Sequence, residues 1–136
     1  MEILNKITVK AVCGELKCDK PQDLCVIIGV VRSSEEVKGI YGTSHRLVGE
    51  FKATNLKTQE TFFSGNCFLP AIAESLVIGQ LDVDNAIQIA FKIGIRPANN
   101  KAGYEYTVKP LIEPAQNNPL AMLESKISVE DIDFKP

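Results

Sequence analysis

The sequence predicts a mainly β domain that contains one short helix and is followed by a C-terminal tail. Apolar and polar residues alternate along several segments of residues 1–113, a pattern typical of strands with one buried face. One later segment, which opens at Pro70, instead repeats apolar residues at helical spacing. Residues 114–136 carry the whole net charge of −2, and we expect them to form a separate appendage. It would consist of a proline-containing linker, a short amphipathic helix over residues 120–127 and an acidic, flexible tail.

Two apolar segments near the N-terminus predict the first two strands. Along residues 3–13 the apolar side chains fall at alternate positions, which leaves two lysines on the opposite face. Residues 24–32 are apolar at almost every position, as in a central strand, and we expect Gly29 to mark a bend or bulge. The polar, glycine-containing residues 33–44 then predict a long mobile loop.

A hairpin and a helix are expected in the middle of the chain. Residues 46–56 and 60–69 read as two strands, and the three residues between them suit a short connection. Phe62 and Phe63 are adjacent in the second strand, so they must point to opposite faces and only one of them is expected in the core. The helix is expected over residues 70–81. Its predicted apolar face consists of Ile72, Leu76 and Gly79.

A second hairpin is expected to complete the domain. Residues 85–97 show the clearest alternation in the chain, with every second residue from Ile87 to Ile95 apolar. Residues 98–103 predict a turn, and residues 104–113 predict the returning strand. Pro110 has no backbone N–H to donate, so it is expected at an edge or at the end of that strand.

The predicted order of elements is a three-stranded meander, a short helix and a final hairpin. This order resembles the oligonucleotide-binding (OB) fold, a Greek-key barrel. On this resemblance residues 1–113 would form an OB-like barrel of five to six strands, in which residues 60–69 extend the third strand through a hairpin. Other small β-barrels and α+β sandwiches produce a similar order, so they remain alternatives.

The chain ends in the acidic and aromatic residues SVEDIDFKP. An OB-like body with such a tail resembles bacterial and bacteriophage single-stranded DNA-binding proteins. The resemblance implies that the tail docks on replication, recombination or repair proteins and can compete with DNA for a cationic groove. It assigns docking to Glu130, Asp131, Ile132, Asp133 and Phe134. The chain departs from the bacterial pattern at its last two residues, because the terminal carboxylate there belongs to Pro136 and not to the aromatic residue.

Binding of single strands requires cations along the phosphate path and aromatic rings on which bases stack. The rings expected in the core are those of Phe51, Phe91, Tyr104 and Tyr106. Tyr41 lies in the predicted loop, and either Phe62 or Phe63 lies outside the core, so these rings are candidates for stacking. The predicted DNA-binding residues are Lys6, Lys10, Arg32, Lys38, Tyr41, His45, Arg46, Lys52, Phe62, Lys92 and Arg96.

The charge of the body neither requires nor excludes nucleic acid as a partner. Residues 1–113 contain 13 basic and 13 acidic residues, so a positive surface can arise only if the cations gather on one face. This neutrality favours an alternative function, a non-enzymatic protein-interaction module such as a phage host-takeover or assembly factor. The tail fits either function. A homodimer is compatible with both.

Several other classes of protein are not expected. The chain has one histidine and lacks the nucleophile, P-loop and dinucleotide motifs of common enzymes, so we expect neither catalysis nor a cofactor. Its four cysteines form no CxxC pair, so no metal is expected, although Cys13, Cys18 and Cys25 would be the candidate zinc ligands. No apolar run reaches the ~18 residues of a membrane span, and the N-terminus lacks a signal-peptide pattern. A cytoplasmic protein is expected, in a bacterial host if the source is a phage.

Overall fold

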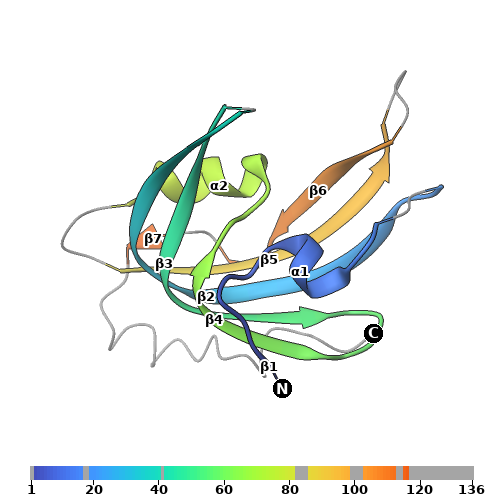
Figure 1. Ribbon diagram of the computed structural model, residues 1–136, viewed down its shortest axis with the longest axis horizontal. Coiled ribbons are helices and arrows are strands. Elements are labelled where there is room, and N and C mark those ends of the chain that lie inside the picture. Colours follow the sequence, from blue (N-terminus) through green and yellow to red (C-terminus); the bar gives the residue numbers. More distant parts are fainter. Residues whose placement is uncertain are drawn as a thin grey trace.

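The fold is built on one curved, mostly antiparallel sheet with two short helices (Figure 1). The computed structural model describes residues 2–16, 19–40, 42–81, 86–98, 103–112 and 115–116. The strands are β1 (Glu2–Ile3), β2 (Gln22–Gly39), β3 (Gly42–Asn55), β4 (Thr61–Cys67), β5 (Ile87–Pro97), β6 (Tyr104–Pro110) and β7 (Ala115–Gln116). The helices are α1 (Val9–Cys13) and α2 (Ala71–Ile78). In the described part of the chain, no helix is both long and apolar enough to cross a membrane.

The strand order confirms the predicted mainly β, OB-like fold, but the sheet is not closed. The order is β1-β4-β3-β2-β5-β6, and β7 pairs separately with β5. The long strand β2 pairs with both β3 and β5, and α2 connects β4 to β5, as the predicted meander, helix and hairpin require. Among the described residues β4 and β6 share no ladder, so the sheet remains open where a complete barrel would join them.

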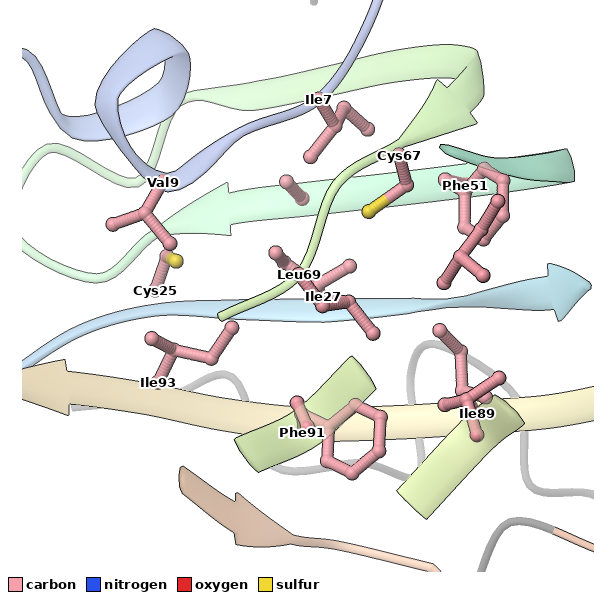
Figure 2. Close-up of a cluster of buried hydrophobic side chains, with 14 of the residues drawn as sticks. Ile7, Val9, Cys25, Ile27, Phe51, Cys67, Leu69, Ile89, Phe91 and Ile93 are labelled. Atoms are coloured by element: carbon pink, nitrogen blue, oxygen red, sulfur yellow. The ribbon is translucent and has the colours of Figure 1, made fainter. Parts of the chain in front are cut away.

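One face of the sheet and both helices enclose the main core (Figure 2). The alternation predicted for β5 is confirmed, because Ile87, Ile89, Phe91 and Ile93 are all fully buried. Figure 2 shows the side chain of Val9 reaching from α1 towards the sheet. The core therefore ties the N-terminal segment to the central strands.

A smaller apolar cluster covers the opposite face of β2 and β5. Val26, Ile28 and Ala90 are buried there, and Leu56, Leu111 and Ile112 pack against them. Leu111 is fixed in place because its backbone N–H donates to the carbonyl of Ala90 over 2.8 Å. This second cluster confirms that the central strand is buried on both faces.

The strand predicted over residues 3–13 is wrong beyond its first residues. Only Glu2–Ile3 forms a strand, which pairs in parallel with β4, and Val9–Cys13 forms helix α1. The Thr8 hydroxyl accepts a hydrogen bond from the backbone N–H of Ala11 over 3.0 Å and so caps this helix. Val9 and Val12 are buried three residues apart, a spacing that places both on one face of a helix. The apolar residues of the same short segment also alternate as they would in a strand, so the sequence pattern alone does not distinguish the two.

The mobile loop predicted over residues 33–44 is also wrong, because β2 and β3 continue as a long hairpin. The pairing runs to Lys38 opposite Thr43 and Gly39 opposite Gly42. Gly42 has a φ of 121°, a conformation that glycine adopts without steric cost. The segment is polar because the end of the hairpin is largely exposed, not because it is irregular.

The bulge expected at Gly29 is not observed in the pairing of β2 with β3. The register shift lies between Val31 and Ser33, whereas Gly29 pairs regularly with Phe51. A Cβ at Gly29 would lie 2.2 Å from the carbonyl oxygen of Glu50. Glycine is required here because the backbone of β3 passes too close for any side chain.

Helix α2 is confirmed, but its predicted apolar face is wrong. The exposed fractions of Ile72 and Leu76 are 58% and 41%, whereas Ala73 and Val77 are fully buried. The helix is short, and its smaller apolar residues allow it to approach the sheet closely. The apolar residues at positions 72 and 76 therefore face away from the core.

Candidate nucleic-acid interface

The outward face of β3 and β4 carries a lysine beside an aromatic ring. Lys52 lies directly opposite Phe63, and its Nζ is 5.9 Å from the centroid of the phenyl ring. Phe62 is instead paired with the buried Ala53 and is only 6% exposed, so its ring lies in the core and not on the surface where DNA binding was predicted. Phe63, which is partly exposed, is the residue of this pair that a base can reach.

A second lysine and phenylalanine meet just beyond the end of β4. The Nζ of Lys6 lies 5.4 Å from the ring centroid of Phe68. Lys6 and Phe68 are held near each other by their sequence neighbours. Ile7 forms a parallel bridge with Cys67, and its carbonyl accepts a 2.9 Å hydrogen bond from the backbone N–H of Phe68. Sequence reasoning missed Phe68, although alternation with the buried Cys67 and Leu69 would have placed it outside the core.

These four residues, Lys6, Lys52, Phe63 and Phe68, form what we call the lysine–phenylalanine surface. Both pairs lie along β4 and the residues that follow it. A lysine ammonium is attracted to the face of a ring, and it can also bind a phosphate without leaving that neighbourhood. The surface therefore supplies the two elements that single-strand binding requires, a stacking ring and an adjacent cation.

The predicted arginines are each engaged by a carboxylate on a neighbouring strand. Arg32 donates to Glu50 over 2.9 Å, Arg96 donates to Glu105 over 3.3 Å, and Arg46 donates to Glu35. Exposed ion pairs of this kind contribute only about 0–1 kcal/mol each, so they are easily exchanged. They nevertheless neutralise the arginines locally, so these side chains do not form a continuous positive stripe.

The remaining predicted lysines are spread over several elements. The Nζ of Lys92 lies 4.0 Å from the carboxylate of Asp23, and Lys92 is paired with Lys109 across β5 and β6. The small apolar cluster over Val26 and Ile28 separates it from Lys52 on the same face. Lys10 is exposed on α1 and Lys38 is exposed near the end of β2, while Tyr41 lies outside the described residues.

His45 has a structural contact in place of the predicted exposed position. Its backbone N–H donates to the Glu74 carboxylate over 2.8 Å, and its Nδ1 lies 3.3 Å from the other oxygen of that group. The contact joins β3 to α2, and both side chains are largely shielded from solvent. His45 therefore anchors the hairpin to the helix, and its role in DNA binding stays a prediction.

Two of the cysteines that the structure describes, Cys25 and Cys67, serve as small core residues. Both are fully buried, and Cys13 is half-buried. A hydrogen bond to Cys13, together with burial, raises the pKa of the Cys25 thiol, and burial raises the pKa of the Cys67 thiol. Both thiols are therefore protonated at neutral pH. Cys18 lies outside the described residues, as does the whole predicted docking segment Glu130–Phe134.

Together, an OB-like sheet and a surface of paired lysines and aromatic rings form a candidate interface of the kind found in oligonucleotide-binding domains. The chain is 37% identical over 131 residues to the single-stranded DNA-binding protein of Enterobacteria phage PRD1. The alignment spans 93% of this chain and 82% of the phage protein, and the chain belongs to the family of that protein. No protein-family model and no solved structure matches the chain.

Proposed function

We propose that this protein binds single-stranded DNA and that its lysine–phenylalanine surface provides a main contact. The supporting observation is the presence of two lysine–ring pairs along one edge of an OB-like sheet, in a chain of the same family as a phage single-stranded DNA-binding protein. Bases would stack on Phe63 and Phe68. Lys52 and Lys6 would turn towards the phosphates on either side of those bases.

The proposed mode of action is stoichiometric and does not involve catalysis. Each ring contributes about 1–3 kcal/mol when a base stacks on it, whatever the base, so the protein can coat strands of any sequence. The lysines add a contribution that weakens as salt increases, because each phosphate contact releases a condensed counterion. Coating of this kind would block reannealing and nuclease attack on exposed strands.

The wider biological role belongs to the same proposal. The protein would act during phage replication or recombination in the cytoplasm of a bacterial host. The segment Glu130–Phe134 would recruit replication or recombination proteins, with its acids binding basic clefts and its aromatic ring filling an apolar pocket. A homodimer would bring two lysine–phenylalanine surfaces to one strand and so raise the effective affinity.

Fluorescence anisotropy with labelled oligo-dT at low and moderate salt tests the proposal. We expect binding at low salt, and we expect Phe63→Leu to raise the Kd roughly tenfold because stacking is lost while apolar volume is largely kept. Lys52→Ala should weaken binding and flatten the salt dependence. Lys57→Ala removes an exposed lysine of the β3–β4 loop and serves as the matched control.

Two results would contradict the proposal at different levels. If the wild-type protein at micromolar concentration does not bind oligo-dT in low salt, the function is wrong and the protein-interaction module remains. If Phe63→Leu binds as tightly as Lys57→Ala, the protein binds DNA but the proposed surface is wrong.

A further inference from the structure

A shallow groove lies on the open side of the sheet, away from the face that bears Lys52. Its volume is about 310 Å³. It is bounded by β6 on one side, and by the start of α1 and the segment after β4 on the other. A closed barrel would join β4 to β6 by hydrogen bonds, so the groove lies beside the opening between these two strands. Its lining residues are Thr8, Val9, Lys10, Phe68, Leu69, Pro70 and Tyr106.

The lining of this groove suits a planar, uncharged ring with negative groups on either side. Two aromatic residues, Phe68 and Tyr106, contribute to it from opposite boundaries. Lys10 is exposed at the rim, and Lys6 lies over the ring of Phe68. None of the lining residues is acidic, so nothing in the lining repels a phosphate.

Tyr106 is held in a fixed position at this groove. Its ring packs edge-on against Tyr104, with centroids 5.6 Å apart and an interplanar angle of 81°. Burial and a hydrogen bond to Tyr104 raise the pKa of Tyr106 to about 12. Its hydroxyl is therefore uncharged at physiological pH and does not repel a neighbouring phosphate.

A second groove in the described part of the chain provides a useful contrast. It measures about 250 Å³ and lies at the other end of α1. Its lining includes the carboxylates of Glu15 and Asp23, beside Lys57. Two acids and one base make it unfavourable for a polyanion, so charge distinguishes the two grooves.

We propose that the groove between Phe68 and Tyr106 binds one nucleobase of the DNA strand, with Lys6 and Lys10 holding the adjacent phosphates. This inference rests on the proposed function and deepens it, because it extends the binding path from Phe63 around the edge of β4 to β6. The volume lies at the lower limit of the roughly 300–1,000 Å³ of small-molecule pockets, which suits a single base. Phe68 is shared between the surface and the groove and connects the two.

Tyrosine fluorescence can test the groove directly. The chain has no tryptophan and three tyrosines, so the double variant Tyr41→Phe/Tyr104→Phe leaves Tyr106 as the only fluorescent ring of this kind. Both substitutions retain the phenyl ring. We expect saturating unlabelled oligo-dT to quench the Tyr106 fluorescence, after correction with free N-acetyltyrosinamide for light absorbed by the DNA. Anisotropy with labelled oligo-dT measures binding by the same variant.

Two further substitutions in the same background separate the groove from the rest of the interface. Phe68→Leu should reduce the quenching at saturation and raise the Kd severalfold. Phe63→Leu, the matched control on β4, should raise the Kd and leave the quenching at saturation intact. If anisotropy shows full binding while the Tyr106 fluorescence is unchanged, the groove proposal is overturned and DNA binding stands. If no variant binds oligo-dT, the proposed function itself fails.

Discussion

At the scale of single residues, the orientation of neighbouring side chains determines which aromatic rings lie on the surface. Phe62 and Phe63 have the same chemistry, and a strand requires only that they point apart. The register of β3 and β4 decides between them, because it pairs Phe62 with Ala53 and Phe63 with Lys52. The residue opposite each ring on β3, and not its neighbour in sequence, therefore shows that Phe62 lies in the core and Phe63 on the surface.

Tyr106 supplies a prediction about alkaline pH. Its pKa is raised to about 12 in the folded protein, whereas a tyrosine in an unfolded chain ionises near pH 10. Between these values the unfolded chain loses the proton more readily, so the free energy of unfolding should fall as the pH rises from about 10 to 12. Below pH 10 this contribution to stability is fully present.

Urea denaturation of wild type and Tyr106→Phe from pH 8 to pH 11.5 measures this effect. The variant has no hydroxyl to ionise at position 106, so its denaturation midpoint should fall less steeply above pH 10. Parallel curves for the two proteins would show that Tyr106 is not the group responsible.

At the scale of elements, regular alternation over a long segment was a reliable guide and short segments were not. The alternation from Ile87 to Ile95 covers most of the eleven-residue strand β5, and it predicted both the strand and its buried face. In α1, five residues satisfy a helical and a strand pattern equally well, and the cap provided by Thr8 decides between them. At the end of the β2–β3 hairpin, both faces are largely exposed, so apolar and polar residues do not alternate. The hydrophobic pattern of the sequence therefore does not indicate that these residues pair as strands.

Helix α2 offers a matched pair of adjacent substitutions. Val77→Ala should lower the free energy of unfolding by about 2 kcal/mol, because a fully buried side chain is removed and leaves a cavity. Leu76→Ala removes a larger side chain that is 41% exposed, and should cost at most about 0.5 kcal/mol. Urea denaturation of both variants measures the difference. A larger loss for Leu76→Ala would restore the helix face expected from the sequence.

At the scale of the whole molecule, a neutral body and an acidic C-terminal segment have separate roles in the proposed mechanism. The body contains equal numbers of basic and acidic residues, and the net charge of −2 lies entirely after residue 113. The positions of the ion pairs could not be foreseen, because each arginine meets its carboxylate across strands whose register the sequence does not state. The arginines are therefore paired with carboxylates and do not gather into one positive surface, whereas Lys6 and Lys52 lie beside aromatic rings.

Truncation after Gln116 tests this division of roles. The cut spares Ala115 and Gln116, which pair with β5, and removes four acids and two lysines. We expect oligo-dT to bind the truncated protein as tightly as the full chain or more tightly, because a net charge of −2 no longer competes for the cations. Anisotropy measures the Kd of both forms.

A charge variant of the full chain is the control for this truncation. The substitutions Glu130→Gln, Asp131→Asn and Asp133→Asn remove negative charge without shortening the protein. They should change the Kd in the same direction as the truncation. Loss of DNA binding in the truncated protein would mean that the C-terminal residues form part of the DNA site.

The cross-strand arginine–carboxylate pairs have a consequence for selectivity between polyanions. A bare polyanion such as heparin, or the backbone of a double helix, reaches the guanidinium groups only by replacing these carboxylates, at a cost of about 0–1 kcal/mol per pair, and it offers no unstacked base in return. An unpaired strand gains the energy of stacking on phenylalanine without disturbing them. On the proposed function, this internal charge neutralisation would make binding depend more on the accessibility of bases than on the density of charge.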